Sequence, residues 1–237
     1  SSSFRIMWVG DPEILPLDPW VRDIDSGQNR SEQVGYGTTR DGAGDARELW
    51  PLGADENANG LLGDALERAA DGGTSRIGHA LAPMGVRYIV VPSRNAPGGV
   101  EGETPDGMVA ALDRQNDLVR RDLDDGLVLY ENEVWIPLRA VVPSIPTDLN
   151  QSATDLVPFV RTDEAATDDL ADPLSAAERV DPGAFAEQVT GPRSGSSPAP
   201  PGIFLWGEAF DPEWSATADG EGLDHFAAFG WSNGFDA

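Results

Sequence analysis

Runs of apolar residues, some continuous and some periodic, predict strands and helices in the first part of the chain. An apolar run at 4–9 and a nearly continuous β-branched run at 86–91 predict two buried strands. Between them, apolar residues recur at helical spacing over 61–69 and again over 77–84. We expect a crossover unit in which the two strands are parallel. The segment 11–60 shows no clear period, and we expect a long ordered loop there.

The pattern continues with one more helix and three more strands. The spacing of apolar residues predicts a helix over 104–112. Two apolar segments at 118–123 and 127–131 flank Asp-Asp-Gly, which is a hairpin signal. A further strand is expected at 138–142.

These patterns divide the chain into three segments. Residues 1–142 form an α/β unit with a mixed sheet, and residues 143–201 are an acidic, proline-rich linker or insertion. Residues 202–237 hold 3 of the 7 tryptophans and 5 of the 8 phenylalanines of the chain. Their short alternating runs predict antiparallel strands like those of a β-sandwich, and we expect them to be part of a carbohydrate-binding-like sandwich. The fold class is therefore predicted to be α+β.

Charge and composition exclude several classes of function. The chain has 237 residues, with 16 Lys+Arg against 41 Asp+Glu, a net charge of -25, and all the basic residues are arginine. So acidic a surface is not expected to bind nucleic acid, because phosphate contacts need basic residues. Cysteine is absent, which removes disulfides and thiolate chemistry. No window reaches the length of a membrane span, and the opening without methionine favours a piece of a longer protein.

Candidate catalytic motifs are weak throughout the chain. Asp23 and Asp25 have the Asp-x-Asp form that holds a divalent ion in nucleotide-sugar transferases, but they lie in a proline-rich stretch and are interpreted as solvated. The two histidines, His79 and His225, are too few for a histidine-ligated metal site. We therefore predict no catalytic residue, no metal site and no cofactor.

The aromatic tail is the cluster that best fits a ligand. Its rings can stack on sugar rings, and His225 can add a polar contact. The candidate rings are Trp206, Phe210, Trp214, Phe229, Trp231 and Phe235. The alternative is that these rings fill a sandwich core. Alternation predicts that Trp214 points inward, whereas the small neighbours of Trp231 predict an accessible ring that contacts the sugar.

Several local motifs together resemble a family of large multi-pass membrane glycosyltransferases of actinobacteria, described as family-2-like. In that family, as the resemblance implies, the transferase site lies elsewhere, so no catalytic residue is carried over. The resemblance implies an extracytoplasmic, C-terminal domain at the plasma membrane. The motifs that carry it are WVGDP at 8–12, TRDG at 39–42, GVRYIVVP at 85–92, DGLVLYEN at 125–132, IPLRAVV at 136–142 and EAFDPEW at 208–214.

The leading expectation is a non-catalytic accessory domain that binds or positions cell-envelope glycan for a membrane glycosyltransferase. Its expected partners are that glycan or a lipid-linked sugar, and the membrane domain of the same polypeptide. Two alternatives stay open: a carbohydrate-active enzyme with acidic catalytic residues, and a scaffold that touches no sugar.

Overall fold

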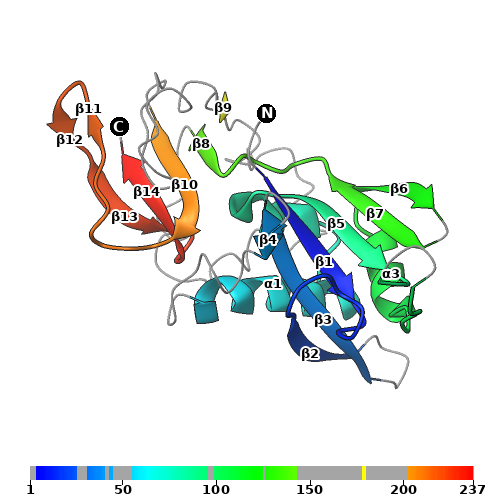
Figure 1. Ribbon diagram of the computed structural model, residues 1–237. Helices are drawn as coiled ribbons and strands as arrows, with labels where there is room; N and C mark the ends of the chain where they lie inside the picture. Colours follow the sequence, from blue (N-terminus) through cyan, green and yellow to red (C-terminus); the bar gives the residue numbers. More distant parts are fainter. Residues whose placement is uncertain are drawn as a thin grey trace.

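The computed structural model describes eight segments of the chain, which form an α+β fold with two main sheets (Figure 1). The described residues are 4–25, 31–40, 43–44, 55–95, 99–124, 126–142, 178–179 and 202–236. Among them, no helix is both long and apolar enough to cross a lipid bilayer.

The first sheet is mixed and has the strand order β2-β3-β1-β5-β7-β6, with β4 paired to β3. β1 and β5 pair in parallel, as predicted, and the other neighbours are antiparallel. The strands are β1 (Arg5–Gly10), β2 (Trp20–Asp25), β3 (Ser31–Arg40), β4 (Ala43–Gly44), β5 (Val86–Pro92), β6 (Leu118–Asp124) and β7 (Leu127–Asn132).

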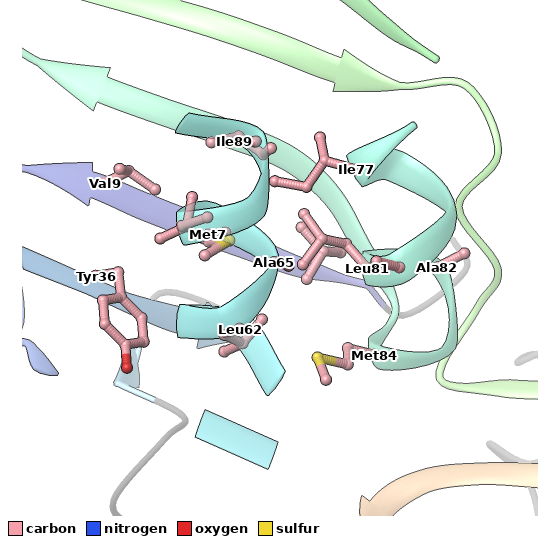
Figure 2. Packing of buried hydrophobic residues seen from close by; sticks show 14 of the residues in the cluster. Met7, Val9, Tyr36, Leu62, Ala65, Ile77, Leu81, Ala82, Met84 and Ile89 are labelled. Carbon is pink, nitrogen blue, oxygen red and sulfur yellow. The ribbon is translucent and has the colours of Figure 1, made fainter. Parts of the chain in front are cut away.

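The helices pack against the apolar side chains of this sheet. They are α1 (Asp55–Ala70), α2 (Ile77–Leu81), the short 3-10 helix η1 (Ala82–Met84) and α3 (Asp106–Asp113), close to the three predicted helical segments. Figure 2 shows Met7 and Val9 of β1 next to Leu62 and Ala65 of α1, and all four side chains are buried. Burial of this apolar surface is the main force that holds the helices on the sheet.

The prediction of a long loop over 11–60 is wrong, because β2 and β3 lie inside it. The signal of β3 was hidden by glycines that the tertiary structure requires. A Cβ atom at Gly35 would lie 3.0 Å from Pro12 Cα, and one at Gly37 would lie 2.6 Å from the side chain of Leu17. The chain after β1 therefore folds back closely over β3, and the lack of a Cβ atom at these two positions leaves room for it.

Tyr130 of β7 connects the sheet to α3 through its hydroxyl, which donates to Asp113 Oδ1 at 2.8 Å and contacts the Val109 carbonyl at 3.3 Å. Burial raises the pKa of Tyr130, and Asp113 raises it further. The folded state therefore favours the protonated phenol, and this contribution to stability is complete below the ordinary tyrosine pKa of about 10.

We expect the free energy of unfolding to fall as pH rises beyond about 10, since the unfolded chain then loses its phenolic proton before the folded chain does. Urea unfolding at about pH 9 and about pH 11 measures this loss. Tyr130→Phe is the control, because it packs the same ring without a titrating group and should show a shallower dependence. Equal dependence in the two proteins would contradict this role of Tyr130.

The second sheet is antiparallel and has the order β13-β14-β10-β8-β9. It confirms the predicted strands of the aromatic tail and also takes in β8, which lies inside the segment 1–142. Of the predicted linker, only 178–179 is described, as the strand β9. The strands are β8 (Arg139–Val142), β9 (Glu178–Arg179), β10 (Ile203–Ala209), β13 (Asp224–Ala228) and β14 (Ser232–Asp236), with a separate hairpin of β11 (Thr217–Ala218) and β12 (Glu221–Gly222).

One face of the second sheet belongs to the same apolar core as the first sheet. Leu205 of β10 and Ala228 of β13 are buried in that core, together with Phe229 and Trp231 from the turn before β14. The two sheets are therefore joined by apolar packing as well as by the chain. The opposite face of the second sheet carries a different set of side chains.

Candidate functional site

The face of the second sheet that is turned away from the shared core is rich in aromatic rings, and we call it the aromatic face. Strand register places Trp206 opposite both Arg139 and Asn233, and places Phe204 opposite Phe235. The loop after β10 adds two more rings. The aromatic face consists of Arg139, Phe204, Trp206, Phe210, Trp214, His225, Asn233 and Phe235.

Six rings of this face form one unbroken series of contacts. Trp214 meets Trp206 edge to face with centroids 5.1 Å apart, and Trp206 meets Phe204 at 5.9 Å. Phe204 stacks on Phe235 at 6.2 Å, and Phe235 stacks on His225 at 4.6 Å. Phe210 closes the series against His225 at 4.9 Å. Such edge and stacked arrangements are the favourable geometries for aromatic pairs.

The exposure of the three candidate tryptophans reverses the prediction from the sequence. Trp231 is only 2% exposed and lies in the core with Phe229, so the prediction of an accessible Trp231 ring is wrong. Trp206 is also buried, at 6% exposed. Trp214, which the alternation of apolar and polar residues predicts to point inward, is half-buried and packs at the edge of the cluster around Trp206. Of the three, Trp214 is the ring that a ligand can reach.

His225, the fourth candidate, is half-buried within the ring series. Its Nε2 lies 3.0 Å from Oδ1 of Asn233. The Asn233 side chain is fully buried and donates to the carbonyls of Glu208 and Ala209 at 3.1 and 3.0 Å. The structure therefore brings His225 and Trp214 to the same face, near opposite ends of the series.

Arg139 lies over the Trp206 ring, with its guanidinium carbon 4.3 Å from the ring centroid. This is the geometry of a cation–π interaction. Burial lowers the pKa of Arg139, nearby Glu208 raises it in part, and Arg40 lowers it. Arg139 thus belongs both to the aromatic face and to a group of charges at the junction of the two sheets.

That junction contains a buried carboxylate between strands that are far apart in sequence. Glu208 of β10 forms ion pairs with Arg40 of β3 and, at 3.8 Å, with Arg5 of β1. The register of β10 shifts between Trp206 and Ala209, as at a β-bulge, and Glu208 lies within this irregular stretch. A bulge changes the direction of side chains along a strand. The shift therefore accounts for a carboxylate that reaches the first sheet.

Sequence analysis included Phe210 and Phe235 among the candidate rings but missed Asn233, Arg139 and Glu208 as members of these groups. Glu208 occurs in the EAFDPEW motif at 208–214, and Arg139 occurs in IPLRAVV at 136–142. The motifs were visible, but the contacts join three strands through pairing that no short-range pattern encodes.

The remaining candidates do not assemble a site. Asp23 and Asp25 are exposed on the edge strand β2. His79 is buried on α2, and its Nδ1 lies 2.8 Å from Asp117 Oδ2. Asp117 Oδ2 also accepts the backbone N–H of His79, so this pair fixes the start of α2. Among the described residues, no group of three or more acidic or histidine side chains is placed to hold a metal ion.

Comparison of the chain with protein-family models, with curated proteins and with solved structures finds no match.

Proposed function

We propose that this chain is a non-catalytic accessory domain of a membrane glycosyltransferase, located on the extracytoplasmic side, and that its aromatic face binds cell-envelope glycan. The motif resemblance supports the link to the glycosyltransferase. The aromatic face supports the glycan contact.

The observation that carries the proposal is the continuous series of six rings, with Trp214 half-buried at one end and Phe210 and His225 half-buried at the other. A sugar binds to an aromatic ring through its C–H face, which requires an accessible ring. Buried rings such as Trp206 hold the accessible ones in place. Trp206 and Phe235 are buried, and the rings that stay half-buried are Trp214, Phe204, Phe210 and His225.

A scaffold that binds no sugar is the second candidate, and the burial of Trp206 and Trp231 favours it. The two candidates differ at Trp214. For a scaffold, this ring only packs on Trp206, whereas for a glycan-binding domain it also contacts the ligand.

Replacing Trp214 with alanine is expected to weaken glycan binding by about tenfold or more, because the accessible stacking ring is lost. Isothermal titration with purified cell-envelope polysaccharide from an actinobacterium measures the change. Trp8→Ala is the matched control, since Trp8 is a half-buried tryptophan on the first sheet whose Nε1 donates to Thr39. Equal affinity of both variants, or no binding by the unaltered domain, would favour the scaffold.

A further inference from the structure

The hydrogen bonds around Asn233 determine which nitrogen of His225 carries the proton. Both N–H groups of the Asn233 amide are directed at backbone carbonyls, those of Glu208 and Ala209. The amide oxygen must then face the other way, where it accepts the backbone N–H of Asp211 at 3.3 Å. A flipped amide would set its oxygen against two carbonyl oxygens. The orientation of Asn233 is therefore fixed by its surroundings.

An amide oxygen has no hydrogen to donate, so the Nε2 atom of His225, 3.0 Å from it, must be the donor. In the neutral imidazole the other nitrogen, Nδ1, then carries a lone pair and acts as an acceptor. Nδ1 makes no hydrogen bond to the described part of the chain, and it is not a buried atom. It is therefore an acceptor in contact with solvent.

The ring is held in this orientation by packing. It stacks on Phe235 with an interplanar angle of 12°, and it lies against Phe210 with an angle of 33°. A tilt of the imidazole out of this plane would break the stacking, and a 180° flip within the plane would break the bond to Asn233. The acceptor is thus presented in a fixed direction beside the half-buried ring of Phe210, and such preorganisation favours binding.

Acidic residues occur in the chain segments that flank this end of the aromatic face. Asp211 begins the loop after β10 and donates its backbone N–H to Asn233, and Glu213 is exposed on the same loop. The whole chain has a net charge of -25. Carboxylates are also acceptors, and they repel anions. The chemistry of this end of the face complements a ligand that donates hydrogen bonds and carries no negative charge.

We propose that Nδ1 of His225 accepts a hydrogen bond from a hydroxyl group of a neutral glycan, and that the site discriminates against glycans bearing carboxylate groups. This inference rests on the proposed function and names the chemical class of its ligand. It makes His225 a specificity-determining residue.

The first test concerns the free domain and does not depend on any ligand. Long-range ¹H–¹⁵N spectra at about pH 8, where an ordinary imidazole is neutral, should show His225 protonated on Nε2. Asn233→Leu, which removes the amide, should abolish that preference. A proton on Nδ1 in the unaltered domain would overturn the inference and leave the proposed function standing.

The second test compares matched neutral and acidic sugars by titration calorimetry. The domain should bind neutral hexasaccharides of galactose, glucose or mannose, and galactose hexasaccharide should bind more tightly than hexagalacturonate. His225→Phe keeps a stacking ring and should weaken neutral binding by about five- to tenfold. Unchanged affinity of His225→Phe, or tighter binding of hexagalacturonate, would overturn the inference while Trp214→Ala still reports on the proposed function. Absence of binding to every sugar would contradict both.

Discussion

Replacement of Trp231 with alanine is expected to lower the free energy of unfolding by about 3–5 kcal/mol, the range for truncation of a buried aromatic side chain. The indole is 2% exposed and belongs to the core that the two sheets share. Its loss leaves a cavity at the junction between the second sheet and the helices. Urea unfolding followed by far-UV circular dichroism measures the change.

Trp214→Ala is the comparison for this experiment, because the same atoms are removed from a half-buried position. We expect a smaller loss, of about 1–2 kcal/mol, in proportion to the apolar area that Trp214 buries. The sequence pattern predicts the opposite order for the two residues. Equal losses, or a greater loss for Trp214, would contradict the described packing of the aromatic face.

Removal of the Glu208 charge is expected to have the other large effect. Glu208→Gln keeps the size of the side chain but leaves Arg5, which is fully buried, and Arg40 without this carboxylate. Breaking a buried ion pair by removing one partner typically costs about 3–5 kcal/mol. Urea unfolding of Glu208→Gln should therefore show a loss of about 3 kcal/mol or more.

Glu213→Gln is the matched control, since Glu213 is exposed in the same part of the chain. A surface substitution of this kind changes stability by no more than about 0.5 kcal/mol. If Glu208→Gln and Glu213→Gln were equally stable, apolar packing alone would join the two sheets. The ion pairs at the junction would then contribute nothing measurable.

Much of the fold was predictable from local pattern. The helix over 61–69, the strand over 86–91 and the hairpin after 118 are marked by period and turn residues, and α1, β5 and the β6–β7 pair confirm them. β3 was not predictable, because two of its residues, Gly35 and Gly37, have low strand propensity. They occur there because the loop after β1 packs closely against them. A residue chosen for a long-range contact carries no local signal.

The error at Trp231 has a similar cause. Small neighbours, Gly230 and Ser232, suggested an uncovered ring, but Leu205 and other residues from distant segments share its core. Phe229 and Gly230 both have positive φ, 53° and 72°, and Trp231 follows them in the same turn before β14, where its ring is buried. Alternation describes side chains within a strand and fails at such turns.

The ion pairs of Glu208 with Arg5 and Arg40 could not be predicted from local sequence pattern. Arg40 and Glu208 are 168 residues apart in the chain, and both occur among many other acidic and basic residues. Only the pairing of β10 with β8 and β14, together with the register shift before Ala209, brings Glu208 to Arg5 and Arg40. Tertiary structure was needed to find them.

The central claim, that the aromatic face binds glycan, is tested most directly by the indole N–H resonances of the tryptophans during a titration with cell-envelope polysaccharide. The account predicts that the signal of Trp214 shifts or broadens with saturation, together with the ring signals of His225 and Phe210. The signals of Trp8 and Trp231 should stay unchanged. Shifts confined to Trp8, or no change at any tryptophan when polysaccharide is present in excess, would contradict it.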